Sequence, residues 1–262
     1  MLRPRIIPCL LVRNKGLVKT VNFKDGKYLG DPINAVRIFN EKEVDELMVL
    51  DIDASAHNLE PDFKMIENLA AECRMPLCYG GGIKTVEHAQ KIISLGVEKV
   101  AISSAAVDNS GLISNIAKEA GSQSVIVVID VKKKMIGGNY EVRIHNGKKS
   151  TGKCPVDFSV QMAKLGAGEI VVNSIDNDGT MKGYDFKLID KIRQSLTVPI
   201  TVIGGAGSLD DLGRVIKKYG IIGAAAGSLF VFKGVYQAVL INYPSRAEKD
   251  VLIGENYNLY KC

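Results

Sequence analysis

Short runs of apolar residues recur along the chain, and each is followed by a turn and a segment with helical periodicity. The runs are continuous rather than alternating, which is typical of strands buried on both faces of a parallel sheet. Amphipathic segments such as residues 85–95 and 155–165 separate them. Eight such units predict an α/β protein with the (β/α)8 TIM-barrel fold. The eight predicted strands begin near Arg5, Glu46, Met75, Lys99, Ser124, Glu169, Val198 and Gly223.

An internal repeat supports this count of strands. The segment from Gly80 (GGGIKTVEHAQKIISLGVEKVAISS) aligns without gaps with the segment from Gly204 (GGAGSLDDLGRVIKKYGIIGAAAGS), an offset of 204 − 80 = 124 residues. A gapless repeat of this length indicates a twofold duplication rather than a chance likeness of glycine-rich loops. We therefore predict one barrel over residues 1–262, with half-barrels at about 1–122 and 123–232 and an atypical C-terminal segment at 233–262.

The composition is that of an ordinary folded protein: 46% of the 262 residues are hydrophobic and 24% are charged. It excludes a disordered, collagen-like or disulfide-scaffold chain. The longest nearly apolar stretch, residues 221–232, falls short of the ~20 apolar residues that span a bilayer. The first residues lack a small-residue cleavage site after their apolar run, so we expect no membrane span and no signal peptide. We expect a cytoplasmic protein.

Charge and cysteine usage narrow the possible partners. The net charge of +5 arises from 34 basic and 29 acidic residues without a dense basic run, so nucleic acid is not indicated, whereas a phosphorylated small molecule is compatible. The cysteines are odd in number, lack a C-x-x-C spacing and accompany only three histidines, so we expect neither a metal site nor a cofactor. They are Cys9, Cys73, Cys78, Cys154 and Cys262.

Glycines and serines follow four of the predicted strands, in two pairs related by the repeat. The carboxyl ends of barrel strands build the active site, where glycines let the backbone approach an anion and amides and hydroxyls donate to it. The duplicated device predicts a substrate with two phosphates that spans the mouth of the barrel; tight turns are the alternative interpretation. The residues concerned are Gly80, Gly81 and Gly82, Ser103 and Ser104, Gly204, Gly205 and Gly207, and Gly227 and Ser228.

Carboxylates also stand at strand ends: Asp51 and Asp53, Asp130, and Asp176 and Asp178. A carboxylate at a barrel mouth acts as a general acid or base when burial raises its pKa. Asp130 is the strongest candidate because it ends the wholly apolar run VIVVID. The alternatives are that it caps the following segment or pairs with residues 132–134. Asp176 and Asp178 belong to a turn-forming sequence that is common in loops.

A long segment, residues 13–31, follows the first predicted strand. It carries Lys15, Lys19, Lys24 and Lys27 between glycines. A lysine-bearing loop with glycine hinges at a barrel mouth predicts a lid over a phosphorylated substrate. A solvated loop without that role is the alternative.

Together the motifs RIIPCLLV, GDP, DELMVLDI, GGGI, GSQSVIVVID, GAGEI, SIDNDGT, GYD and GGAG resemble the cyclase subunit of imidazole glycerol phosphate synthase. The resemblance runs from about residue 3 to residue 232 and is highly specific. It implies a duplicated (β/α)8 barrel with two phosphate sites and a glutaminase partner docked on the opposite, N-terminal face. That partner supplies the ammonia with which the family cleaves and cyclises a phosphoribulosyl-formimino carboxamide nucleotide.

The resemblance also implies roles for individual residues. Lys19 corresponds to the lysine of the mobile first loop, and Asp130 to one of two catalytic aspartates. Strand-end position and resemblance together predict substrate and phosphate contacts at Asp51, Gly81, Gly82, Ser103, Ser104, Asn173, Asp176, Asp178, Gly179, Gly204, Gly205, Gly227 and Ser228.

The chain departs from the family pattern at the position of the other catalytic aspartate, at the end of the first strand, where it has Leu11. Leucine transfers no proton, and loss of one acid/base partner removes at least the ~10²- to 10⁴-fold that such catalysis supplies. Ser103 and Ser104 replace an expected Asn-Thr pair, Asn173 replaces a threonine and Ile203 a serine. Beyond residue 232 the last helix of the family is not recognisable.

Four charged residues at strand starts fall on the positions that gate the family's ammonia passage: Arg5, Glu46, Lys99 and Glu169. The repeat alone places them at the N-terminal face of the barrel. Crossed pairs of bases and acids would close a narrow polar pore above apolar walls. The alternative is a purely stabilising role, which residues at this face commonly have.

We therefore expect a relative of the cyclase subunit that keeps the ammonia passage and the anionic mouth but serves C–N bond formation outside histidine synthesis. Wider members of the family are associated with amidination of surface-polysaccharide sugars, which is the favoured role. The authentic histidine-pathway lyase/cyclase remains open, with Asp51 or water replacing the missing acid, as does a non-catalytic channelling subunit. The sister-family sugar-phosphate isomerase is disfavoured because it needs both aspartates and no gate.

Overall fold

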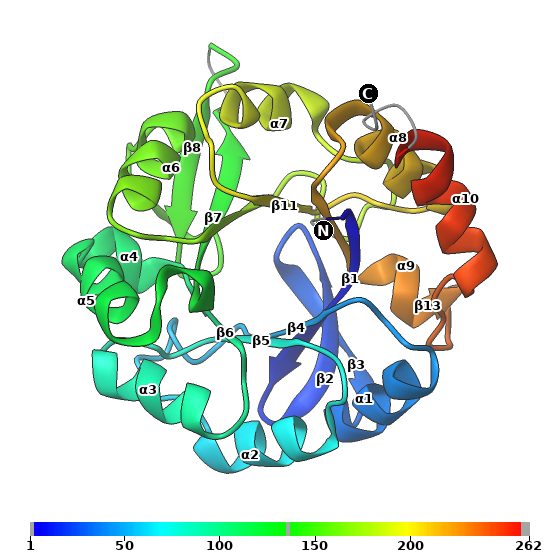
Figure 1. Cartoon of the computed structure of the whole chain (residues 1–262), viewed down its shortest axis with the longest axis horizontal. Helices are drawn as coiled ribbons and strands as arrows, with labels where there is room; N and C mark the ends of the chain where they lie inside the picture. Colours follow the sequence, from blue (N-terminus) through cyan, green and yellow to red (C-terminus); the bar gives the residue numbers. More distant parts are fainter. Residues whose placement is uncertain (1–2, 135–136, 258–262) are drawn as a thin grey trace.

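Eight parallel strands close into a barrel surrounded by helices in the computed structural model, which describes residues 3–134 and 137–257 (Figure 1). Parallel pairing runs continuously around the sheet, and β12 pairs with β1 to close it. The structure confirms the predicted (β/α)8 fold, with strand starts within about two residues of the prediction. The barrel strands are β1 (Arg5–Arg13), β4 (Leu47–Asp51), β5 (Leu77–Gly80), β6 (Lys99–Ile102), β7 (Val125–Lys133), β10 (Glu169–Ser174), β11 (Ile200–Ile203) and β12 (Gly223–Ala226).

Helices cover the outside of the barrel (Figure 1). Several begin at a side chain that accepts a backbone N–H of the first turn, as Thr85 does for α3 and Ser208 for α8, which explains where they start. The outer helices are α1 (Pro32–Glu41), α2 (Phe63–Glu72), α3 (Val86–Ser94), α5 (Gly111–Ala120), α6 (Pro155–Lys164), α7 (Phe186–Arg193) and α8 (Leu209–Tyr219). Shorter turns are α4 (Ser104–Asp108), η1 (Ser122–Ser124) and α9 (Ser228–Val231), of which α4 and α9 follow β6 and β12.

The apolar side chains form two separate layers. The larger lies between the strands and the helices and includes Val49, Tyr79 and Val127. The smaller fills the bore of the barrel with Ile7, Cys9, Met48, Cys78, Ala101, Ile126, Val128, Val171, Ile203 and Ala225. Because side chains alternate between the two faces of a strand, continuous apolar runs supply both layers at once.

Two strand ribbons extend the mouth of the barrel. The segment after β1, predicted as a lid loop, instead forms β2 (Gly16–Val21) and β3 (Lys24–Gly30), which pair antiparallel with β1 and with each other. Left-handed backbone at Asn22 and Phe23 makes the turn between them. In the second half β8 (Tyr140–Ile144) and β9 (Lys149–Ser150) extend β7 in the same way.

The C-terminal segment contains a helix that the sequence did not predict. After a two-stranded turn, β13 (Phe232–Lys233) and β14 (Ala238–Val239), the chain forms α10 (Arg246–Tyr257), which packs against α8. Ser245 and Glu248 exchange hydrogen bonds at its start, a reciprocal cap.

The half-barrel boundaries stay a prediction.

Cys9, Cys73, Cys78 and Cys154 are free thiols, and Cys262 lies outside the described residues. Among the residues that the structure describes, no helix is both long and apolar enough to cross a membrane.

Candidate functional site

A cavity opens at the carboxyl ends of the barrel strands, where the strand-end residues were predicted to meet. The predicted residues that line it are Lys19, Asp51, Gly80, Gly81, Ser103, Ser104, Asp130, Asn173, Asp178, Gly179, Gly204, Gly205, Gly227 and Ser228. Four predicted residues are outside the lining: Asp53, Gly82, Asp176 and Gly207. The Gly82 amide donates to Ser55 Oγ at 3.3 Å, and the exposed Asp176 accepts from the Lys133 amide at 2.8 Å. The roles of all these residues remain predictions.

Asp130, at the carboxyl end of the apolar part of β7, is the carboxylate whose pKa the structure perturbs most clearly at the mouth. Asn173 Nδ2 donates to its Oδ1 at 2.9 Å and Ser103 Oγ to its Oδ2 at 3.4 Å. Burial raises the pKa of Asp130 to about 7, against the opposing effect of these two hydrogen bonds and with a smaller raising contribution from Asp178. In the described part of the chain its partners are therefore an amide and a hydroxyl rather than the lysines considered above.

Leu11 lies across the mouth from Asp130. β1 and β7 are separated by three strands on either side of the barrel, so their side chains meet from opposite walls. Leu11 pairs with Leu50 of β4, and both pack onto the apolar cluster of the bore. The wall that faces Asp130 is therefore apolar at the height where a second acid was expected.

Lys19 reaches the mouth from β2 and is buried there. Its Nζ donates to Asp178 Oδ1 at 2.8 Å, and Thr20 Oγ1 donates to Asp178 Oδ2 at 3.0 Å. The Asn22 amide donates to the Asp178 carbonyl at 2.9 Å. The ribbon predicted as a lid is thus fastened over the loop after β10, and the Lys19 ammonium pairs with the Asp178 carboxylate.

Two glycines related by the repeat make the backbone turns at the edge of the cavity. Gly81 and Gly205 have φ of +127° and +113°, a left-handed conformation that favours glycine. A Cβ at Gly81 would lie 2.6 Å from the Asp51 carbonyl oxygen, and one at Gly205 2.1 Å from the Gly183 carbonyl oxygen. The two loops therefore need glycine for both conformation and space, and each brings bare backbone to the mouth.

Several lining residues were missed by the sequence analysis. Arg13 at the end of β1 forms an ion pair with Asp53 at 2.8 Å. His145 and Asn146 reach the cavity from the turn between β8 and β9, where Asn146 Nδ2 donates to Asp53 at 3.4 Å. The sequence signal for His145 and Asn146 was the turn-forming His-Asn-Gly stretch, whose three residues have left-handed backbone.

Asp51, which also lines the cavity, has a pKa that burial raises.

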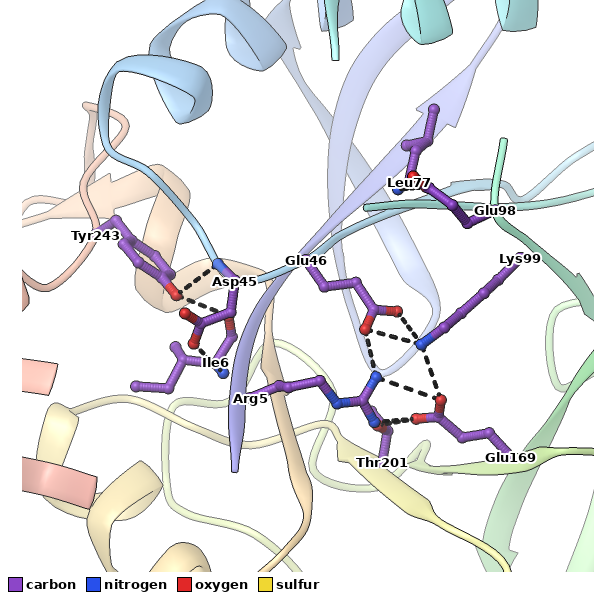
Figure 2. Close-up of polar contacts among 10 residues, drawn as sticks. All are labelled: Arg5, Ile6, Asp45, Glu46, Leu77, Glu98, Lys99, Glu169, Thr201 and Tyr243. Atoms are coloured by element: carbon purple, nitrogen blue, oxygen red, sulfur yellow. Dashed lines mark hydrogen bonds and ion pairs between the residues drawn. The ribbon is translucent and has the colours of Figure 1, made fainter. Parts of the chain in front are cut away.

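At the opposite end of the barrel the four predicted gate residues meet in one ring (Figure 2). Arg5 Nη2 contacts Glu169 Oε1 at 2.7 Å, and Arg5 also binds Glu46. Lys99 Nζ lies 2.9 Å from Glu46 Oε1 and 3.1 Å from Glu169 Oε2. Each base thus contacts both acids, and both acids are buried.

The ring has a fifth member that the sequence analysis missed, Thr201 of β11, whose hydroxyl donates to Glu169. Its signal was a single polar residue in an otherwise apolar strand. Burial alone would lower the pKa of Arg5 and raise that of Glu169. The opposite charges in the ring reverse both effects, so the Arg5 pKa is raised and the Glu169 pKa lowered. Arg5 and Glu169 are therefore held in their charged forms.

The apolar cluster of the bore lies between the ring and the mouth. Its described residues have apolar side chains or a thiol. Small ones, Ala101 and Ala225, stand beside Cys9 and Cys78. Burial raises the pKa of Cys9 to about 12, which keeps its thiol neutral. This apolar cluster therefore lies between the polar ring and the polar mouth.

Comparison of the sequence with known proteins shows its family. Residues 5–237 match the family model described as histidine biosynthesis protein, so the chain belongs to the histidine biosynthesis protein family. Within that class it is a relative of the HisF subunits of imidazole glycerol phosphate synthase.

Two relatives have names that assign them only provisionally to that subunit. The protein of Leptospira borgpetersenii is 60% identical over 252 residues, or 96% of this chain and 99% of the relative. The protein of Vibrio vulnificus, named as hisF3, is 57% identical over 249 residues, or 95% and 96%. The HisF subunit of Alkaliphilus metalliredigens is 41% identical over 235 residues, or 90% and 93%.

Proposed function

We propose that this chain accepts ammonia from a glutaminase docked on its N-terminal face and uses it at the barrel mouth to form a C–N bond on a phosphorylated substrate. The favoured role lies outside histidine synthesis, in the amidination of a surface-polysaccharide sugar. The observation that carries the proposal is the contrast between the two ends of the bore. The ion-pair ring is complete, whereas Leu11 stands where Asp130 would need a second acid.

Ammonia is a neutral molecule, and an apolar bore admits it more readily than a charged ammonium ion. The ring of Arg5, Glu46, Lys99 and Glu169 supplies polar groups at the entrance, and the bore beyond it offers no charge. At the mouth the duplicated glycine turns offer backbone amides for anionic groups at two opposite edges. These features support a route from the N-terminal face to an anionic substrate.

Asp130 supplies the proton chemistry in this proposal. With a pKa of about 7 it is half protonated near neutral pH, the state in which a carboxyl group both donates and accepts protons efficiently. When ammonia adds to an electrophilic carbon, the new C–N bond forms as an electron pair moves onto the heteroatom of the electrophile. Asp130 gives that heteroatom its proton, and the resulting carboxylate takes the proton that the added nitrogen must lose.

Turnover with an ammonium salt, in place of a glutaminase, tests the altered chemistry. The substrate is the histidine-pathway nucleotide, and the proteins are the wild type, Leu11→Asp and the near-isosteric control Leu11→Asn. The proposal expects the wild type to be slower than Leu11→Asp by at least ~10²-fold, because only the aspartate restores an acid/base pair. Leu11→Asn, which is polar but does not ionise, stays slow.

Robust turnover by the wild type would contradict the proposal and identify the chain as an ordinary histidine-pathway lyase/cyclase, the second candidate. What favours that candidate is the 41% identity to HisF subunits whose names carry no provisional label. A third outcome concerns channelling without catalysis. If Asp130→Asn leaves ammonia transfer to the native acceptor unharmed, Asp130 is vestigial and the catalytic part of the proposal fails.

A further inference from the structure

Tyr243, in the C-terminal segment, is buried on the side of β1 opposite the ion-pair ring (Figure 2). Its hydroxyl donates to the Ile6 carbonyl oxygen at 2.8 Å and accepts from the Asp45 amide at 3.3 Å. Its ring packs against the buried Phe230 with centroids 5.3 Å apart. One side chain from the end of the chain thus touches the backbones of both β1 and the start of β4.

These contacts stand where the regular pairing of the two strands has not yet begun. The ladder between β1 and β4 starts at Cys9 and Met48, closer to the mouth. At the level of Ile6, side chains bridge the two segments instead. Asp45 Oδ2 accepts a hydrogen bond from the Ile6 amide at 3.0 Å, and the Tyr243 hydroxyl donates one to the Ile6 carbonyl oxygen. The spacing of the two strands at this end therefore depends on Asp45 and Tyr243.

The same segment also fixes the Asp45 carboxylate. Lys249 of α10 donates from Nζ to Asp45 Oδ1 at 3.1 Å and to the Glu43 carbonyl at 3.2 Å. Arg3 adds a longer contact to Asp45 at 3.4 Å. Because the Asp45 side chain is almost fully buried, these cations compensate its charge and hold it in place.

The residues fastened in this way adjoin two members of the ring. Arg5 precedes Ile6 on β1, and Glu46 follows Asp45 in the two residues just before β4. Arg5 and Glu46 bind each other directly across the same gap between the strands. Any change in the spacing of β1 and β4 at this level therefore alters the Arg5–Glu46 contact first.

We propose that Tyr243 is a positioning residue for the ring. Through Tyr243 the C-terminal segment sets the spacing of β1 and β4 at the level of Ile6 and Asp45. Tyr243 and Lys249 lie beyond residue 237, where the match to the family model ends. The C-terminal segment thus contributes to fixing the entrance of the bore. The inference rests on the proposed function only in taking that entrance as the passage for ammonia.

Nitrogen-15 NMR of lysine NH3⁺ groups tests the inference on the full chain and needs neither ammonia nor an acceptor. Lys99 reports on the ring, and Lys19, a buried lysine paired with Asp178 at the other end of the barrel, is the internal reference. The variant is Tyr243→Phe, which keeps the ring packing and removes only the hydroxyl. One matched control, Tyr219→Phe, loses a tyrosine–carboxylate hydrogen bond between α7 and α8, and the other, Tyr236→Phe, alters a tyrosine that is 97% exposed.

Tyr243→Phe removes both hydrogen bonds of the hydroxyl. We expect it to speed hydrogen exchange at the Lys99 ammonium about threefold to tenfold, as a net loss of about 1 kcal/mol implies, with Lys19 unchanged. Both control variants leave the two signals as in the wild type. Unchanged Lys99 exchange in Tyr243→Phe overturns the inference, as does equal acceleration at Lys19, which indicates general loosening instead. Either failure leaves the proposed function to its own turnover assay, so the two are distinguishable.

Discussion

Replacing Asp130 by asparagine removes the carboxyl group whose pKa burial raises to about 7. The substitution keeps the shape of the side chain and its hydrogen bonds: the amide oxygen accepts from Asn173 Nδ2, and the amide nitrogen donates to Ser103 Oγ. It removes only the proton equilibrium. The pH dependence of folding then changes in a direction that the raised pKa of Asp130 determines.

The unfolded chain releases the Asp130 proton at a pKa of about 3.9, whereas the folded chain holds it to a pKa of about 7. The stability from this group is therefore fully present below pH 4 and is lost as the pH rises through 7. Between pH 5 and pH 8 the loss amounts to about 2.7 kcal/mol, two pH units at 1.36 kcal/mol each. Because one side of the carboxyl faces the open cavity, water reduces the loss to on the order of 1–2 kcal/mol.

Urea unfolding at pH 5 and pH 8 measures this quantity for the wild type and Asp130→Asn. The wild-type free energy of unfolding is expected to fall between the two pH values by about 1–2 kcal/mol more than that of the variant. Asp176→Asn is the matched control, since the Asp176 carboxylate is exposed beside the same mouth, and it retains the wild-type slope. If wild type and Asp130→Asn lose stability in parallel, burial does not raise this pKa and the assignment of Asp130 as a neutral-pH acid is wrong.

Two further substitutions test the mouth and the ring by unfolding. Gly205→Ala is expected to destabilise the fold by about 2 kcal/mol more than Gly234→Ala. Both glycines have left-handed backbone, but only at Gly205 would the new Cβ clash with a carbonyl oxygen. Equal losses would show that the loop moves to make room for the Cβ. Lys99→Met leaves buried carboxylates short of a cation and is expected to cost about 3 kcal/mol. Lys64→Met breaks an exposed ion pair and is expected to destabilise the fold far less, so a similar loss for both variants would refute the argument from burial of the ring.

The sequence predicts most of the barrel because its signals are local. β7 and β10 appear as unbroken apolar runs, and a strand buried on both faces leaves that pattern whatever lies around it. The ribbon of β2 and β3 was missed because its lysines and glycines read as a loop, and its pairing with β1 is a tertiary contact. α10 was missed because it lacks a strong apolar stripe and is held by polar contacts at its start.

The candidate site divides in the same way. Asp130 and the glycines Gly81 and Gly205 were predictable because they stand at strand ends, which the fold gathers at one face. His145 was not, since β8 and β9 carry it back to the mouth after the chain has left the strand. Thr201 and Tyr243 act at the N-terminal end, and only three-dimensional proximity shows that they adjoin the ring.

The ring of ion pairs also bears on how the two parts of the barrel recognise each other. Residues 3–122 contribute Arg5, Glu46 and Lys99, an excess of one positive charge, and the rest of the chain contributes Glu169. Two copies of the first part would bring four cations to two acids, and two copies of the second would bury acids without cations. Since unpaired buried charge is costly, each part prefers the other to its own kind. In the predicted division into half-barrels, the ring therefore disfavours the pairing of two like halves and limits which halves such barrels can exchange.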